Sequence, residues 1–452
     1  MNRLLQFFRG SGDDPQLDWV DEYIRRVKPY IYVRMRDHLL IKRPNQVVKL
    51  NPTGALILHE LLAGTSIRAV MGDLDRRKKD EVALFLHAVR KQVESGLNPY
   101  GGHPAVETEQ FEAPFSEWPV LSEVALTYRC NLRCRFCYAG CNCTRKESGR
   151  AELGVDGFRE VLRQIREEAG VPSVSFTGGE PTLVPFLPDL IRYAKDLDMR
   201  VNLISNGTLI DGDMARRLVD AGLDSAQISI EAANADLHDH IAGCKGSFDR
   251  TVEGVRALVA TGIHVHTNTT LHRHNLDAAR DIPAFVRWDL GLDRLSMNLV
   301  IPTGSVATHG DVHVRYSDAI DPILRVRESC EREGIEFMWY SPLPMCIFNT
   351  VAHGLGNKGC AACEGLLSVN PWGEVLPCAS YDDPVGSLLD EGFDTVWHSL
   401  KARYCRNKSF AHEMCRQCPD FAICQGACPL YWKVSGYDEL APFHATLNPI
   451  KS

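Results

Sequence analysis

Short apolar runs and amphipathic segments alternate along the middle of the chain. Each run has the composition of a β-strand, and each segment after it carries apolar residues at helical spacing. About six such units follow one another up to roughly residue 320, which predicts a parallel sheet, built either as a barrel or as an open sheet. The predicted strands cover residues 122–128, 173–179, 201–207, 225–231 and 264–271, and the predicted helices cover 155–170, 187–198, 215–222 and 250–262.

Residues 21–99 follow another pattern, in which β-type runs come first and helices follow. Asn51 can cap the first helix, Pro52 suits its first position, and Gly64 suits its end. The basic run 76–79 is expected to be a solvated turn between the next two helices. Three strands with three helices predict a winged-helix-like module. The runs cover 30–35, 38–42 and 46–50, and the later helices cover 67–74 and 80–97.

Composition fits a folded protein of several domains. The chain has 452 residues, of which 44% are hydrophobic and 24% charged, with a net charge of −8. This charge argues against nucleic acid as a partner of the whole molecule, although residues 21–99 hold 15 Lys and Arg against 9 Asp and Glu. No apolar stretch is long enough to span a membrane and no secretion signal is apparent, so we expect a cytoplasmic protein without membrane association.

The 16 cysteines are unevenly placed. None lies before residue 130, five lie in 130–143 and nine in 346–428. Such clustering in a reducing compartment favours metal binding or redox chemistry over disulfides. The remaining two, Cys244 and Cys330, fall in or near predicted helices and are expected to be small buried side chains.

Cys130, Cys134 and Cys137 form a C-x3-C-x2-C pattern on the loop after the first strand of the repeat. Three thiolates this close can hold one iron–sulfur cube and leave its fourth iron without a protein ligand. A structural zinc site is the alternative, but such sites usually close with four protein ligands.

This triplet, with Phe136 before its last cysteine and Thr177-Gly178-Gly179-Glu180-Pro181 after the second strand, resembles the radical S-adenosylmethionine (SAM) superfamily. The resemblance implies an α/β fold with a partial (β/α)6 TIM-like barrel. It also implies a [4Fe–4S] cluster whose open iron binds SAM. Reductive cleavage of SAM would give a 5′-deoxyadenosyl radical that removes a hydrogen from a substrate.

By the same resemblance, polar residues at the strand ends line a SAM pocket. Gly178 and Gly179 would let the backbone approach the methionyl group, and Glu180 would accept a bond from its ammonium. Each polar position could instead be a simple loop cap. The implied cofactor-binding residues are Phe136, Gly178, Gly179, Glu180, Ser205, Asn206, Ser229 and Glu231.

The later cysteines resemble the SPASM extension of radical SAM enzymes, which holds two auxiliary [4Fe–4S] clusters. The pattern is Cys363-x9-Gly373-x4-Cys378, followed by C-x2-C-x5-C-x3-C, and a hairpin turn is expected at 370–374. Two zinc sites or a single auxiliary cluster are the alternatives. The resemblance implies that cluster I binds Cys363, Cys378, Cys428 and either Cys360 or Cys346, and that cluster II binds Cys415, Cys418 and Cys424.

One departure affects cluster II, because the family usually has a further cysteine after the position of Cys428 and this chain has none. Its fourth ligand would then be Asp438, Cys405 or His444, or one iron would stay open. Short apolar runs in 341–452 suggest that metal centres replace a large apolar core there.

Other candidates are weaker. Cys141 and Cys143 are either loop thiols or neighbours of another redox group. Asn268 and Arg294 could face the barrel interior and orient a substrate. His264, His266, His272 and His274 alternate, which permits a metal site but more often marks ordinary strand or barrel-lining residues.

Residues 21–99 also resemble PqqD-like domains, which bind a leader peptide by adding it to a sheet edge. The leading hypothesis is therefore a radical SAM/SPASM oxidoreductase that matures a ribosomally made precursor peptide through a C–C, C–S or related crosslink. It would take electrons from a flavodoxin or ferredoxin. The alternatives are tetrapyrrole or metallocofactor maturation with a relic N-terminal module, and an iron–sulfur DNA-binding redox regulator.

Five segments follow from these patterns. They are an N-terminal segment (1–20), the peptide-recognition module (21–99), a linker (100–118), the radical SAM barrel (119–340) and the SPASM domain (341–452).

Overall fold

The structure is a computed structural model of the whole chain. It describes residues 17–42, 46–72, 74–95, 117–141 and 150–443. Contacts between Cα atoms divide the chain into two compact units, Met1–Glu112 and Ala113–Ser452. No helix of the described ranges is both long and apolar enough to cross a bilayer.

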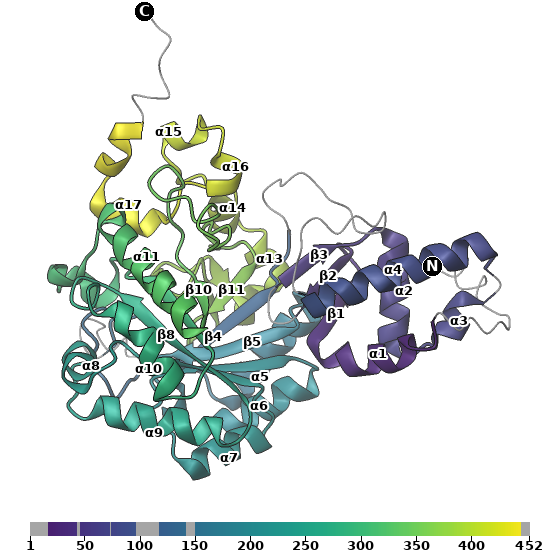
Figure 1. The fold of residues 1–452 in the computed structure, drawn as a ribbon, viewed down its shortest axis with the longest axis horizontal. Helices are drawn as coiled ribbons and strands as arrows, with labels where there is room; N and C mark the ends of the chain where they lie inside the picture. The colour runs from purple at the N-terminus through teal and green to yellow at the C-terminus, as the bar shows by residue number, and fades with distance from the viewer. Residues whose placement is uncertain (1–16, 43–45, 73, 96–116, 142–149, 444–452) are drawn as a thin grey trace, which may run out of the picture. The chain divides into compact units, whose positions relative to one another are not determined.

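In its described residues, the first unit is a three-stranded antiparallel sheet packed with four α-helices. Figure 1 shows the sheet and helices of this unit. The strands follow one another in the order β1-β2-β3, each paired with its neighbour in sequence. A single apolar core joins sheet and helices, and it includes Ile31, Leu58 and Phe85. The elements are α1 (Val20–Val27), η3 (Lys28–Tyr30), β1 (Ile31–Arg34), β2 (Leu39–Lys42), β3 (Gln46–Lys49), α2 (Pro52–Ala63), α3 (Ile67–Met71) and α4 (Arg76–Ser95).

The predicted boundaries of α2 are confirmed. The side chain of Asn51 accepts a hydrogen bond from the backbone N–H of Gly54 at 2.7 Å, which satisfies one of the free donors of the first turn. Gly64 ends the helix with a left-handed backbone at φ +105°.

Two expectations for this unit are wrong. The basic run 76–79 is not a turn, because it forms the first turn of α4. Asp75 makes this possible: its carboxylate accepts a hydrogen bond from the backbone N–H of Lys78 at 3.0 Å and offsets the repulsion between the helix dipole and the basic side chains. The helix α1 was not predicted, so the described residues of the module hold four α-helices where three were expected.

The second unit is built on one large sheet in which seven consecutive strands run parallel. This confirms the predicted parallel α/β fold. About six strands were expected up to residue 320, and the structure has a seventh parallel strand. The extra strand is β10, which lies beyond residue 320. The strands are β4 (Leu121–Thr127), β5 (Ser173–Gly178), β6 (Arg200–Ser205), β7 (Ser225–Ser229), β8 (His264–Leu271), β9 (Arg294–Leu299) and β10 (Glu336–Trp339).

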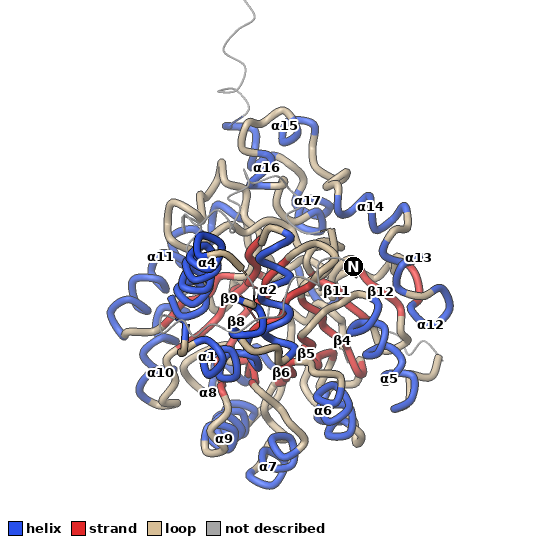
Figure 2. Tube along the Cα trace, turned by 90° about the vertical axis from the view of Figure 1, so that its right-hand side faces the viewer, coloured by secondary structure: helices blue, strands red, loops and turns tan. Residues whose placement is uncertain are grey.

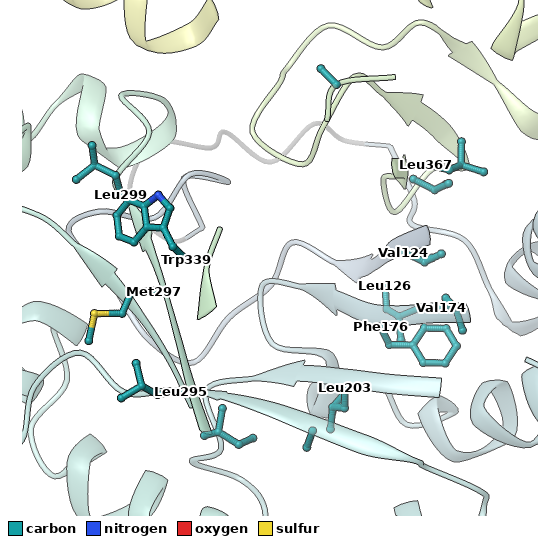
Figure 3. Packing of buried hydrophobic residues seen from close by; sticks show 14 of the residues in the cluster. Val124, Leu126, Val174, Phe176, Leu203, Leu295, Met297, Leu299, Trp339 and Leu367 are labelled. Atoms are coloured by element: carbon teal, nitrogen blue, oxygen red, sulfur yellow. The ribbon is translucent and has the colours of Figure 1, made fainter. Parts of the chain in front are cut away.

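Helices between these strands cover the outer face of the sheet (Figure 2). Side chains alternate along each strand, so that Val174 and Phe176 of β5 join the apolar core under the helices, whereas Ser175 lies on the opposite face. Figure 3 shows this core along the strands. The helices are α5 (Val155–Arg163), α6 (Leu187–Asp196), α7 (Gly212–Asp220), α8 (Ala235–Ala242), α9 (Ser247–Val259), α10 (Ile282–Trp288) and α11 (Tyr316–Glu333).

Strands between residues 366 and 387 continue the same sheet. Strand β11 (Leu366–Val369) pairs in parallel with β4, and the predicted hairpin at 370–374 joins it to β12 (Glu374–Leu376), which pairs with β13 (Gly386–Ser387). The fully buried Trp397 and Tyr431 belong to the core of the large sheet, so the C-terminal segment does have a substantial apolar core. The helices are α12 (Leu388–Glu391), α13 (Phe393–Trp397), α14 (Leu400–Arg406), α15 (Glu413–Arg416), α16 (Phe421–Cys424) and α17 (Pro429–Ser435).

Candidate active site and cluster-binding cysteines

The loop that carries the first cysteine triplet follows β4 and is held by backbone hydrogen bonds from several sides. The N–H groups of Arg133 and Arg135 donate to the carbonyls of Ala242 and Ile241, at 2.9 and 3.2 Å, near the end of α8. The carbonyl of Cys137 accepts from the N–H of Ser305 at 2.9 Å. The loop is therefore fixed by segments far away in sequence.

Two glycines let other backbone segments approach this loop. A Cβ at Gly179 would lie 2.2 Å from the carbonyl oxygen of Arg129, and a Cβ at Gly304 would lie 2.3 Å from the carbonyl oxygen of Cys137. Gly179 was expected to make room for SAM, but in the structure it first makes room for the cysteine loop. Gly304, in the turn η7 (Gly304–Ala307), was not predicted, since a Thr-Gly-Ser turn has no pattern that points to a distant loop.

The three cysteines of this loop are all partly exposed. Burial raises the pKa of Cys130 to about 11. The pKa of Cys137 is lowered to about 6, chiefly by a hydrogen bond from the Cys141 thiol and also by backbone N–H groups of residues 139–141. A sulfur surrounded by donors suits a metal-bound thiolate. Cys141 thus has a definite neighbour, whereas Cys143 lies outside the described residues.

Glu180 is completely buried and joins the ends of two strands. Its carboxylate accepts hydrogen bonds from the backbone N–H and hydroxyl of Thr182, at 3.0 and 2.6 Å, and from the Ser205 hydroxyl at 2.9 Å. A fourth comes from the backbone N–H of Asn206 at 2.9 Å. Burial raises the pKa of Glu180, and these four bonds oppose that shift. The carboxylate expected to meet the SAM ammonium is therefore already engaged within the protein.

Asn206 extends this network to the cysteine loop. Its side-chain N–H₂ group donates to the side-chain oxygen of Asn131 at 2.9 Å and lies 3.9 Å from the Cys130 sulfur. Its own side-chain oxygen accepts from the backbone N–H and the hydroxyl of Thr208. Glu180, Asn206 and Cys130 thus form one connected group, although Asn131 and Thr208 were not predicted to take part.

Glu231 lies just after β7 and faces β8. It is buried and accepts a hydrogen bond from the backbone N–H of Thr270 at 3.0 Å, while burial raises its pKa to about 8. Ser229 is partly exposed on β7 and pairs in register with Asn268 of β8. These two residues are brought to the same edge of the sheet as Glu180, as predicted from the strand ends.

Phe136 stacks on His272, with 5.2 Å between the ring centroids. Burial lowers the pKa of His272 to about 3, so this imidazole is neutral near pH 7. The aromatic residue before Cys137 therefore also anchors the cysteine loop to the end of β8.

The sheet face away from the helices is lined by hydrogen-bonded polar side chains. Asn268 donates to Asn298 at 2.9 Å, and His266 lies 3.2 Å from the Gln227 side-chain oxygen. Arg294 pairs with Glu336 at the other end of the strands. Within the described ranges, no three His, Cys, Asp or Glu side chains are placed to hold a single metal ion. Two further histidines of the series contact charged side chains, since His264 lies 3.2 Å from Arg294 and His274 lies 3.0 Å from Asp311.

The nine cysteines of 346–428 lie in two groups. In the first, the thiols of Cys363 and Cys405 are hydrogen-bonded to each other, and burial raises the pKa of Cys378, with smaller effects from the Cys360 and Cys428 thiols. Cys405, which was considered for cluster II, belongs here. The buried Arg406 donates to the carbonyl of Cys363 at 3.0 Å.

The second group surrounds a small pocket that is partly open to solvent. Its lining includes Cys346, Cys415, Cys418 and Cys424 beside apolar residues such as Met414 and Phe421. Burial raises the pKa of Cys346 to about 11, and the nearby Cys424, Cys415 and Cys418 thiols add to this rise. Asp438 is not among the pocket's lining residues, and His444 lies outside the described residues.

Cys330 is buried in α11, as expected. Cys244 is only partly buried, and its sulfur accepts a hydrogen bond from Arg250 at 3.4 Å, so the expectation of a buried side chain is wrong for it.

Two family models match the regions that hold these groups. The radical SAM superfamily model matches residues 124–286, and the model of the SPASM iron–sulfur cluster-binding domain matches residues 360–419. The fold and these matches define a radical SAM enzyme. The chain carries a radical SAM superfamily domain over residues 124–286 and a SPASM domain over residues 360–419.

Relatives of known function include two kinds of enzyme. An AdoMet-dependent heme synthase of Oleidesulfovibrio alaskensis is 28% identical over 69% of this chain and 83% of its own length. A PqqA peptide cyclase of Streptomyces rochei is 29% identical over 68% of this chain and 83% of its own length.

Solved structures share the fold. SuiB of Streptococcus suis bound to its precursor peptide SuiA has a TM-score of 0.64 at 18% identity, over 89% of this chain and 95% of SuiB. The enzyme anSMEcpe with bound AdoMet has a TM-score of 0.53 at 16% identity, over 73% of this chain and all of the other.

The family implies a [4Fe–4S] cluster with SAM, and the SPASM domain implies auxiliary iron–sulfur clusters. When bound, the first cluster and SAM supply the electron transfer that generates a 5′-deoxyadenosyl radical. The cysteine groups described above fit these cofactors in residue type and number. The hypothesis of a DNA-binding regulator is not supported, since the matched domain is that of an enzyme.

Proposed function

We propose that this enzyme modifies a ribosomally made precursor peptide and that its first unit binds the leader of that peptide. The observation that carries the proposal is the free edge of β3. Within the described ranges β3 pairs with β2 alone, and its side chains are exposed or half-buried. An unpaired edge of this kind can accept a peptide as a further strand.

The backbone of β3 has a defined outward side. The N–H of Leu50 donates to the carbonyl of His38 at 2.8 Å, so these two residues form a hydrogen-bonded pair. Because such pairs alternate along an antiparallel ladder, Val48 also bonds to β2, whereas Val47 and Lys49 direct their backbone groups outward. Two residues of β3 are therefore available to a peptide strand.

Two comparisons support a peptide substrate. One relative is a PqqA peptide cyclase, and SuiB is recorded with its precursor peptide. The match to SuiB covers 89% of the chain, a share that residues 113–452 alone cannot supply. The excess of basic residues in 21–99 would suit an acidic leader.

The proposal is tested with a peptide encoded beside the gene, made synthetically and labelled with a fluorophore. Val47→Pro removes the outward N–H and blocks strand addition, but it leaves the bonds between β2 and β3 intact. We expect peptide affinity to fall at least tenfold, while reductive formation of 5′-deoxyadenosine without peptide is unchanged. Val47→Ala is the matched control and should bind normally. Equal binding by both variants would reject strand addition at β3.

The second candidate is maturation of a tetrapyrrole, which the similarity to heme synthases supports. Anaerobic turnover with SAM, dithionite and either the peptide or a heme precursor separates the two candidates by mass spectrometry. A modified tetrapyrrole with no peptide product would overturn the first proposal. A flavodoxin or ferredoxin as the physiological electron donor remains a prediction.

A further inference from the structure

The nine SPASM-region cysteines separate into five and four. The five are Cys360, Cys363, Cys378, Cys405 and Cys428, and the four that line the pocket are Cys346, Cys415, Cys418 and Cys424. A [4Fe–4S] cube has four irons, and each takes one external ligand, so four thiols are a complete set.

Cys346 comes to this pocket from a distant part of the sequence. It lies 69 positions before Cys415, in the segment that follows β10. The backbone N–H of its neighbour Met345 donates to the Cys424 sulfur at 3.4 Å, which fixes the chain next to the C-terminal thiols. Residues 429–452 contain no cysteine that could take the same place.

We propose that Cys346 is the fourth ligand of auxiliary cluster II, together with Cys415, Cys418 and Cys424. Cluster II then has no open iron, in contrast to the cluster of Cys130, Cys134 and Cys137. Apolar side chains, among them Met414 and Phe421, line the same pocket. Cluster II therefore passes electrons rather than binding substrate, whichever substrate the enzyme modifies. Cys360 is left for cluster I.

The decisive comparison is made in full-length protein whose SAM cluster has been removed by Cys130→Ala, Cys134→Ala and Cys137→Ala. This parent should hold about eight irons, four in each auxiliary cluster. Cys346→Ala is added to it, and both proteins are reconstituted anaerobically and oxidised with ferricyanide. An iron without a thiolate ligand is lost as Fe²⁺, so that a [4Fe–4S]²⁺ cluster becomes [3Fe–4S]⁺ with release of one electron to the oxidant.

We expect the parent to keep its iron and to lack the [3Fe–4S] EPR signal. The Cys346→Ala protein should lose about one iron and show that signal. Cys244→Ala, which removes a thiol hydrogen-bonded to Arg250, is the matched control and should behave as the parent. A [3Fe–4S] signal already present in the parent, or none after Cys346→Ala, would overturn the proposal.

A second measurement needs no substitution and so does not depend on the folding of a variant. Cys346 is exposed in the polypeptide. In the reconstituted wild-type enzyme it should resist iodoacetamide as Cys415, Cys418 and Cys424 do, and it should react after removal of iron by a chelator. Cys244 should react in both states. Alkylation of Cys346 in fully loaded enzyme, detected by peptide mass spectrometry, would also overturn the proposal.

Discussion

The Ser205 hydroxyl donates a hydrogen bond of 2.9 Å to the carboxylate of Glu180, so the ends of β6 and β5 are joined by a buried polar contact. The same carboxylate binds the backbone N–H of Asn206, whose side chain reaches the loop of Cys130. The loop that carries the cluster ligands is therefore linked by hydrogen bonds to the strand ends that are expected to meet SAM.

Glu180→Gln should weaken this hydrogen-bond network and lower the free energy of unfolding. A glutamine can keep its oxygen where Oε1 accepts from Thr182 and Ser205, so its N–H₂ would face the backbone N–H of Asn206, and this buried donor loses its acceptor at a cost of about 1–3 kcal/mol. Urea unfolding measures the loss, and calorimetry should show SAM binding weakened by roughly tenfold, the equivalent of about 1.4 kcal/mol. Thr182→Val removes a single hydroxyl donor and should cost only about 1 kcal/mol. Wild-type stability of Glu180→Gln would argue against the network.

Gly179→Ala should displace the cysteine loop, because the new Cβ would lie 2.2 Å from the carbonyl oxygen of Arg129. We expect the loss of about four irons with about eight retained, since the auxiliary cysteines lie elsewhere. Gly310→Ala is the control, because nothing lies within 4 Å of a Cβ at that position. The measurement is the iron and sulfide content of both variants after reconstitution. Full iron content in Gly179→Ala would show that the loop can move aside.

Local sequence was sufficient for features with a local cause. The cap of α2 by Asn51, the alternation of strands and helices, and the spacing of Cys130, Cys134 and Cys137 all depend on neighbours within a few residues. The start of α4 was missed because a single cap, Asp75, outweighs four basic side chains in the first turn.

Long-range pairing could not be predicted in the same way. β11 pairs with β4 although the two strands are more than two hundred residues apart in sequence. The composition of Leu366–Val369 does not indicate which strand it pairs with. Likewise, the sequence allowed Cys346 or Cys360 as the upstream ligand of cluster I, and only the placement of Cys346 beside Cys415, Cys418 and Cys424 separates the two.

His266 should make stability depend on pH. Burial lowers its folded-state pKa to about 4, and the positive charges of the stacked His264 and of Arg294 act in the same direction. The unfolded chain binds this proton near pH 6.5, so the stabilisation is complete above that pH and is lost as the pH falls towards 4. Between pH 7 and pH 5 this one group should cost about 2 kcal/mol.

The measurement compares wild type with His266→Gln by urea unfolding at both pH values. Gln can keep a hydrogen bond to Gln227 but does not titrate, so the variant should lose about 2 kcal/mol less than wild type on acidification. Effects of acid on the clusters are common to both proteins and cancel in the difference. If both proteins lose the same free energy of unfolding between pH 7 and pH 5, His266 is protonated in the folded protein at pH 5.

Lys408 should tune the reduction potential of the cluster formed by the first cysteine group. Its ammonium is buried, pairs with Glu364, and donates to the carbonyl of Cys360. A positive charge stabilises the reduced, more negative cluster, so Lys408→Met should lower the potential by roughly tens of millivolts. EPR-monitored redox titration in protein without the SAM cluster measures the shift. Lys401→Met, which removes an exposed ammonium paired with Asp383, should leave the potential unchanged. Adding Glu364→Gln to Lys408→Met should reverse most of the shift in reduction potential. If the shift persists in the double variant, the Lys408 side chain acts through packing rather than through its charge.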